Sequence, residues 1–218
     1  KLGQFTPSDS MKEVDMHICF FSGDITRAGG TERVSTQIAN ALTESGRYRI
    51  SFVSLFEQNT RPAYNIDEGI SRHVLYNRPV RGVTHCPQIC TRLAKLVVRQ
   101  HIDVIIDIDC ILDMYSLAIR KFVGVKVISW EHFNFLQNPD VPFRKYTRQW
   151  AAKAADAIVT LTATDVELYT SHLKVKCPIL EIPNPMDMPQ DGGRYDASSH
   201  MLVSCGRFVP QKGFDMLV

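Results

Sequence analysis

The sequence predicts an α/β fold with a doubly wound parallel sheet, and three observations lead to this class. Short apolar segments of strand length alternate with longer segments whose apolar residues recur at helical spacing, as in successive βαβ units. The segment 103–108 (DVIIDI) is a mostly apolar run of the kind that a parallel sheet buries on both faces. Of the 218 residues, 44% are hydrophobic and 22% are charged, which is ordinary for a globular chain and excludes a disordered or coiled-coil protein.

The first strand is expected over 14–21, and a glycine-bearing loop follows over 22–30. A helix over 31–45 comes next, with Thr31 as its N-cap and Gly46 as its stop, because its apolar residues share one face. The alternation then continues: we expect strands over 49–55, 73–76, 103–108, 126–130, 157–162 and 178–182, and helices over 86–100, 111–122, 142–155 and 164–172.

A change of composition after residue 185 predicts a domain boundary. Residues 14–185 would form the first domain, and the stretch 186–200, rich in Pro, Gly and Asp, would be a linker. Residues 201–218 would be the truncated start of a second domain, with a strand over 201–205 and the opening of a helix at 214–218. Residues 1–13 are expected to be a disordered tail or residues added to the natural protein. The chain is therefore expected to be a fragment.

Several function classes are disfavoured by composition. The net charge of +2 does not demand a polyanion as partner, no apolar run approaches the roughly 18 residues of a membrane span, and no signal peptide opens the chain. The six cysteines are scattered through a chain too long to need disulfide staples, which favours a reducing cytosol. Cys86 and Cys90, next to His85, lack a second ligand pair, so a structural role is favoured over a zinc site.

Three loops that follow expected strands carry residues suited to phosphate or sugar. In the first, Gly29 and Gly30 lie where a helix begins, so a phosphate could approach backbone N–H groups at the positive helix end. This loop matches neither G-x-G-x-x-G nor a P-loop, and a glycine pair is equally typical of a tight turn.

In the second loop, Glu131 and His132 follow the strand 126–130, at the edge where open α/β sheets hold ligands. His132 suits a hydrogen bond to a sugar or phosphate oxygen, and Glu131 could orient or deprotonate a ligand; an ordinary surface loop is the other interpretation. In the third loop, Arg207 and Lys212 offer a forked donor and a point charge, a pair that suits a diphosphate.

Taken in this order, the motifs resemble those of family 4 of the retaining glycosyltransferases, which have the two-domain GT-B fold. The matching segments are 29–32 (GGTE), 131–134 (EHFN), 182–187 (IPNPMD) and 203–213 (VSCGRFVPQKG). The resemblance covers 14–218. It implies that 14–185 is the acceptor-side Rossmann-like domain, and that 201–218 is the first βα unit of a second Rossmann-like domain, which binds the nucleotide-sugar.

The resemblance also implies roles for individual residues. Gly29 and Gly30 would bring backbone amides to the donor diphosphate. His132 would contact the donor sugar. Arg207 and Lys212 would neutralise the leaving diphosphate, where charge grows in the transition state. Glu131 would lie on the donor side in a positioning role, because these enzymes are held to transfer on the donor's front face without a conventional base.

No metal and no other cofactor is implied, since the nucleotide-sugar is itself the donor substrate. The family's Glu-x7-Glu motif lies further along than residue 218, so the 218-residue chain is expected to lack transferase activity.

The expected partners are a nucleotide-sugar donor and a lipid-linked or saccharide acceptor used in cell-surface polysaccharide or glycolipid synthesis. Nucleic acid is not expected, since no nucleic-acid-binding motif accompanies the charge. Two other classes stay open: a GT-B-fold sugar-nucleotide epimerase and a non-catalytic Rossmann-like binding module. Arg207 and Lys212 argue against the module, because a scaffold has no need of a diphosphate clamp.

Basic residues gather in two acid-free stretches. The first contains Arg72, Arg78, Arg81, Arg92, Lys95 and Arg99, and the second contains Arg144, Lys145, Arg148 and Lys153, with Trp150 among them. Each cation beside an anionic leaflet contributes about 1 kcal/mol, so these faces suit an anionic membrane surface. Solvated helix faces are the alternative interpretation. The expected location is the cytoplasm, with peripheral attachment at the inner face of the cytoplasmic membrane.

Overall fold

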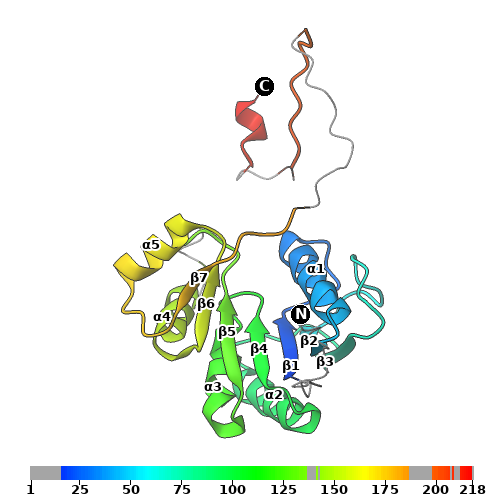
Figure 1. The fold of residues 1–218 in the computed structure, drawn as a ribbon, viewed down its shortest axis with the longest axis vertical. Helices are drawn as coiled ribbons and strands as arrows, with labels where there is room; N and C mark the ends of the chain where they lie inside the picture. The colour runs from blue at the N-terminus through cyan, green and yellow to red at the C-terminus, as the bar shows by residue number, and fades with distance from the viewer. Residues whose placement is uncertain are drawn as a thin grey trace, which may run out of the picture. The chain divides into compact units, whose positions relative to one another are not determined.

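The computed structural model describes residues 16–136, 141, 143–186, 198–206, 208 and 212–217. The chain divides between Pro185 and Met186 into two units, which are described separately. The first unit holds seven strands and five helices in its described part (Figure 1). The strands are β1 (Met16–Ser22), β2 (Tyr48–Phe56), β3 (Ser71–Tyr76), β4 (Val104–Asp107), β5 (Lys126–Trp130), β6 (Ala157–Thr160) and β7 (Ile179–Glu181). The helices are α1 (Gly30–Glu44), α2 (Cys86–Gln100), α3 (Asp113–Val123), α4 (Arg144–Ala154) and α5 (Ala163–His172).

The strands form one parallel sheet in the order β3-β2-β1-β4-β5-β6-β7. Strand β1 pairs with β2 on one side and with β4 on the other, so Ile18 lies beside both Ile50 and Val104. The strand order reverses at β1 and β4, and ligands of such sheets bind outside the carboxyl ends of the strands at this point. The predicted α/β fold with a doubly wound parallel sheet is confirmed.

The core has two layers, one on each face of the sheet. Alternate residues of β1 point to opposite faces, as the period of a strand requires: Phe20 belongs to one layer and Cys19 and Phe21 belong to the other. Helix α1 contributes Val34 and Ala39 to the layer around Phe20. Helices α2, α3, α4 and α5 all contribute to the opposite layer.

Most elements fall where the sequence predicts them, but one cap does not. The predicted N-cap of the first helix, Thr31, is wrong, because α1 begins earlier and Gly29 is its N-cap. The helix ends at Glu44, and Gly46 then takes a positive φ of 67°, a conformation that favours glycine. Gly124, with a φ of 72°, ends α3 in the same way.

The second unit differs from the prediction. The expected strand over 201–205 is wrong, because these residues are exposed and pair with no strand in the described part of the chain. An isolated strand leaves its backbone groups without a ladder, so apolar composition alone does not make one. The expected helix opening is a short 3-10 helix, Phe214–Met216, and the ring of Phe214 packs 4.8 Å from that of Phe208.

None of the helices in the described ranges combines the length and hydropathy that crossing a bilayer takes. The cysteines are free thiols. The Sγ atoms of Cys86 and Cys90 lie 4.0 Å apart on α2, and Cys90 also donates to the backbone oxygen of Tyr115.

Candidate functional site

Three loops meet at the carboxyl edge of the sheet, after β1, β4 and β5. Asp24 fixes the first loop: its Oδ1 accepts from the amide of Thr26 at 2.9 Å and from the Thr26 hydroxyl at 2.5 Å. Its Oδ2 accepts from the amide of Gln58, and Thr26 Oγ1 accepts from the amide of Asn59, both at 3.2 Å. Asp24 is buried, so the loops after β1 and β2 are held together by a shielded polar network.

The first turn of α1 carries a carboxylate of its own. Glu32 is almost fully buried, and it accepts from the Arg27 guanidinium and from the Thr31 hydroxyl, the latter at 2.8 Å. A carboxylate in the first turn is stabilised by the positive end of the helix. A Cβ at Gly29 would lie 2.1 Å from Glu32 Oε2, whereas a Cβ at Gly30 would meet nothing within 4 Å. Any side chain at position 29 would therefore displace the Glu32 carboxylate from its present position.

The loop after β5 presents two ring nitrogens. The rings of Trp130 and His132 lie 4.2 Å apart, and both Trp130 Nε1 and His132 Nε2 are buried without a hydrogen-bond partner among the described residues. Buried polar groups normally have partners, so these two atoms are candidates for contact with a ligand. Burial lowers the pKa of His132 to about 4, and the carboxylates of Asp109 and Glu32 oppose this shift. The imidazole is therefore neutral at physiological pH.

Glu32 and His132 belong to two loops at the carboxyl edge of the sheet, after β1 and after β5. Glu32 belongs to the α1 N-terminus, next to Gly29 and Gly30, and Asp109 follows β4. Both carboxylates act electrostatically on the His132 imidazole. The predicted site residues Gly29, Gly30 and His132 follow β1 and β5 of one parallel sheet and so lie at the same edge, although three helices, α1 to α3, separate them in the chain.

Glu131 is the centre of a buried ion-pair network. Its Oε2 accepts from Arg148 Nε at 2.7 Å and from the Tyr169 hydroxyl at 3.1 Å. Its Oε1 accepts from Arg144 at 3.2 Å and from the amide of Phe133 at 3.1 Å. With the side chain 1% exposed and both oxygens engaged, Glu131 fixes the loop that carries His132.

Arg144 joins this loop to the loop after β4. Its guanidinium donates to Asp109 Oδ2 at 3.2 Å, to Glu131, and to Cys110 Sγ at 3.5 Å. Asp109, Cys110 and Glu131 are the one group of potential metal ligands found among the described residues. The guanidinium already serves all three as the cation, and burial raises the pKa of the Cys110 thiol well above its usual range, so the thiol stays protonated. These three residues do not fit a metal site.

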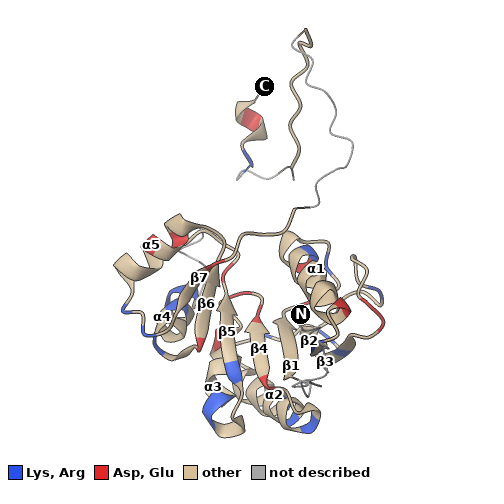
Figure 2. Ribbon diagram, viewed as in Figure 1, with Lys and Arg blue, Asp and Glu red and all other residues tan. Residues whose placement is uncertain are grey.

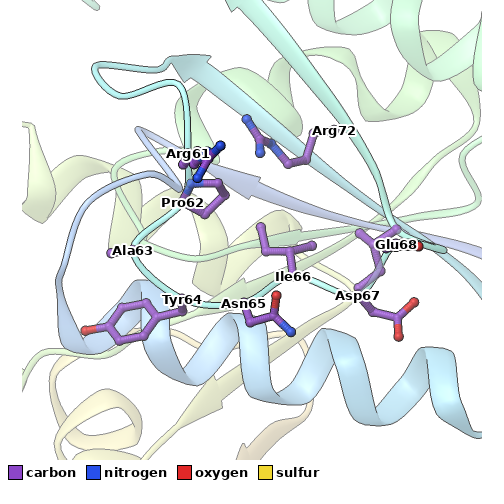
Figure 3. Close-up of a pocket in the computed structure, with 10 residues that line it drawn as sticks. Arg61, Pro62, Ala63, Tyr64, Asn65, Ile66, Asp67, Glu68 and Arg72 are labelled. Carbon is purple, nitrogen blue, oxygen red and sulfur yellow. The ribbon is translucent and has the colours of Figure 1, made fainter.

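Two adjoining pockets lie beside this edge, along the segment that follows β2. One has a volume of about 490 Å³ and is lined by residues of 61–72 (Figure 3). Figure 3 shows Arg61 and Arg72 together at one side of this pocket, with Ile66 between them and Asp67. The other pocket, of about 570 Å³, includes Thr26 of the first loop and shares Arg61 and Ala63 with its neighbour.

Not every predicted site residue can be placed. Lys212 belongs to the second unit, and Arg207 lies outside the described residues. No role was expected for Trp130, although it directly precedes the Glu-His pair. The two arginines at 144 and 148 were predicted as surface charges, which is wrong, because both are buried.

Comparison with known proteins places the chain among the glycosyltransferases. The profile of Glycosyltransferase Family 4 matches residues 28–189. A protein of Haemophilus influenzae described as an uncharacterized glycosyltransferase is 30% identical over 201 residues, which are 92% of this chain and 56% of that protein. The chain thus spans little more than half the length of this curated relative.

Solved structures share the fold at low sequence identity. The sucrose-phosphate synthase of Thermosynechococcus elongatus superposes with a TM-score of 0.64 at 13% identity, over 77% of this chain and 48% of that one. The lipopolysaccharide outer core galactosyltransferase WaaB, in its apo form, gives 0.58 at 17% identity, over 80% and 47%. Anabaena HepE, in complex with UDP and glucose, gives 0.55 at 14% identity, over 79% and 45%.

Proposed function

The chain belongs to Glycosyltransferase Family 4. From this premise we propose that it takes part in the transfer of a hexose from a nucleotide-sugar to an acceptor. One observation carries the proposal: His132 Nε2 is buried without a described partner and lies within electrostatic reach of Glu32 in the first turn of α1. A site between the β5 loop and a glycine-bearing helix N-terminus suits a ligand with both a sugar and a diphosphate. HepE, which has the same fold, was solved with UDP and with UDP-glucose.

In the proposed reaction the bond between the anomeric carbon and the diphosphate oxygen breaks, and a bond to the acceptor oxygen forms on the same face. The proton of the acceptor hydroxyl passes to the departing diphosphate. The amides of Gly29 and Gly30 lie at the positive end of α1 and would approach the diphosphate. Lys212 and Arg207 would stabilise the charge that grows on it as it leaves. The neutral His132 imidazole would donate or accept a hydrogen bond at a sugar hydroxyl.

We assign Glu131 to positioning on the donor side and not to proton transfer. Its two oxygens accept four hydrogen bonds, from Arg144, Arg148, Tyr169 and the Phe133 amide. A carboxylate engaged in this way holds the His132 loop rigidly, as a binding site requires. The proposed transfer includes no metal, because the guanidinium of Arg144 is the cation that the carboxylates of Asp109 and Glu131 contact.

For the acceptor, we propose the two adjoining pockets along 58–72, because they open beside the glycine loop at Thr26. The acceptor class is a saccharide or a lipid-linked saccharide in cell-surface polysaccharide or glycolipid synthesis. The proposed place of action is the cytoplasm, at the inner face of the cytoplasmic membrane.

The test uses a protein that carries this chain at the length of its family relatives. It is incubated with a panel of UDP-, GDP- and ADP-hexoses and a membrane extract as acceptor, and both nucleotide release and labelled product are measured. We expect transfer from one donor, and loss of about 10²-fold or more in turnover for Lys212→Ala and Arg207→Ala. Lys95→Ala, on the exposed face of α2, is the control.

Other results would contradict the proposal. Conversion of the nucleotide-sugar to its epimer, without transfer to any acceptor, would assign the protein to the epimerases. Binding of a nucleotide-sugar without any turnover would favour a binding module. The 218-residue chain is assayed in parallel, and we expect no turnover from it.

A further inference from the structure

The outer face of α4 combines aromatic and basic side chains. Lys145, Tyr146, Gln149, Trp150 and Lys153 fall at helical spacing along one stripe, opposite the buried residues of the same helix. Tyr146 is 67% exposed and Trp150 is 40% exposed. Large aromatic side chains with a polar tip are enriched where protein meets the membrane interface. Lysine stems lie along such surfaces while their charged ends reach outward.

An apolar pocket of about 460 Å³ adjoins this stripe. It lies between α4, the start of the segment after His132, and the end of α5, and Phe135, Leu136 and Leu173 supply its apolar lining. Leu136 is 60% exposed, and Phe143, at the start of α4, is also exposed. Apolar side chains exposed together beside a pocket mark a binding surface.

The charge around the stripe is positive. Lys174 and Lys176 follow α5, and Figure 2 shows blue over α4 and over the segment between α5 and β7. The backbone of Lys176 bonds to that of Ala152, so this segment lies directly beside α4. Of the acids between 144 and 176, Asp165 is buried and Asp156 pairs with Arg120, which leaves Glu167 as the exposed one in this part of the chain.

We propose that this face of α4, with its pocket, docks onto an anionic phospholipid surface. The surface has the features of an interfacial helix: aromatic side chains, flanking lysines and an apolar recess that suits an acyl chain. Its pocket begins at Phe135, three residues after His132, so docking brings the lipid surface next to the candidate site. This inference rests on the proposed function, because the membrane would present the lipid-linked acceptor of the proposed transfer to the candidate site.

The outer face of α4 differs from the basic face of α2 in which of its predicted cations are exposed. Arg144 and Arg148, which sequence reasoning counted with it, face inward to Glu131. On α2, Arg92 donates to the backbone of Leu75 and stacks 4.1 Å over the Tyr76 ring, which leaves Lys95 and Arg99 as that helix's outward cations. Residues on α2 thus provide a matched control.

The experiment measures vesicle binding with no donor or acceptor present, so that its failure is distinct from a failure of sugar transfer. The chain is sedimented with phosphatidylglycerol vesicles and with phosphatidylcholine vesicles. We expect binding to the anionic vesicles that 0.5 M NaCl weakens. Lys145→Gln with Lys153→Gln should lower the partition coefficient about tenfold or more. Lys95→Gln with Arg99→Gln should leave it within about twofold.

Tryptophan fluorescence gives a second readout. Trp130 is 4% exposed and Trp150 is 40% exposed, so a vesicle-induced blue shift should come from Trp150 and disappear in Trp150→Phe. Equal binding to both lipids, or loss of binding in the α2 variant with the α4 variant unchanged, would overturn the proposal. A dimer in lipid-free buffer that Trp150→Ala dissociates would assign the face to a second copy of the chain and would overturn it as well.

Discussion

Arg148 Nε donates to Glu131 Oε2 at 2.7 Å, and the two side chains are 6% and 1% exposed. A buried charge is stable only with its partner in place. The pair therefore holds α4 against the loop that carries His132, and a substitution of either partner should alter the position of His132.

Glu131→Gln should lower the free energy of unfolding by about 3–5 kcal/mol, because it leaves Arg148 buried without its counter-charge and leaves Arg144 with Asp109 alone. Urea unfolding at pH 7 measures this. Glu167→Gln, on the exposed surface of α5, is the control and should stay within about 0.5 kcal/mol of wild type. A Glu131→Gln protein within 1 kcal/mol of wild type would contradict the role given to the network.

Gly29→Ala and Gly30→Ala form a matched pair at the start of α1. The new Cβ at position 29 would lie 2.1 Å from Glu32 Oε2 and should displace that carboxylate from Arg27 and Thr31. We expect a loss of about 1–3 kcal/mol for Gly29→Ala and a change within about 0.5 kcal/mol for Gly30→Ala. Thermal and urea unfolding compare the two. Equal effects would mean that Glu32 moves aside without cost.

Asp113→Asn should change how stability depends on pH. Asp107 and Asp113 are fully buried, and the Asp107 carboxylate acts electrostatically on Asp113; Ser116 donates to Asp107, and Ser129 donates to Asp113 at 2.7 Å. Burial raises the pKa of Asp107 to about 7 and that of Asp113 well above its usual range. The folded state therefore holds more protons than the unfolded state, and wild-type stability should fall as pH rises from about 4 through 7.

In Asp113→Asn the side-chain amide does not titrate, so position 113 has no proton to lose. The variant should gain stability relative to wild type as pH rises, by at most about 1.4 kcal/mol per pH unit for each proton removed from the linkage. Urea unfolding at pH 5, 6, 7 and 8 gives the difference. Parallel curves for the two proteins would exclude the pair as the source of the pH dependence.

His132→Gln should change the pH dependence of stability in the opposite direction to Asp113→Asn, with its effect at low pH. Burial holds the pKa of His132 at about 4, against 6.5 in an unfolded chain, so acid protonates the unfolded state first. Wild type should lose stability relative to the variant as pH falls from 6.5 toward 4, by up to about 3 kcal/mol. Above pH 7 the difference should be constant. His200→Gln, at an exposed position, controls for the loss of an imidazole.

The layered fold could be predicted because its signals are local. Helix α2 lies at Cys86–Gln100, as its apolar spacing predicts, and β4 lies within the apolar run 103–108. The strand expected at 201–205 is wrong because strand formation needs a neighbouring strand, which composition does not report. Residue type favours Thr31 as the N-cap, but the structure has Gly29, with an extended backbone, at that position.

The site could be predicted only in part. The positions of Gly29, Gly30 and His132 after strands indicated the carboxyl edge, since parallel strands end together. The Glu131 network could not be foreseen, because Tyr169 meets Glu131 only when α5 packs against β6 and β7. The burial of the two arginines could have been predicted from helical spacing. One helical face carries Arg144, Thr147, Arg148, Ala151 and Ala152, and small alanines on a face indicate that it packs inward.

The pairing of β1 with β4 determines when the site can exist during synthesis. His17 donates its amide to Asp103, 86 positions later, and β5 joins the sheet only after β4. The ribosome must therefore release the whole segment from β1 through β5 before His132 can reach the glycine turn that follows β1. Until then the nascent chain exposes one edge of β1, and because contacts this distant in sequence form slowly, that edge stays open to pairing with other chains over the interval.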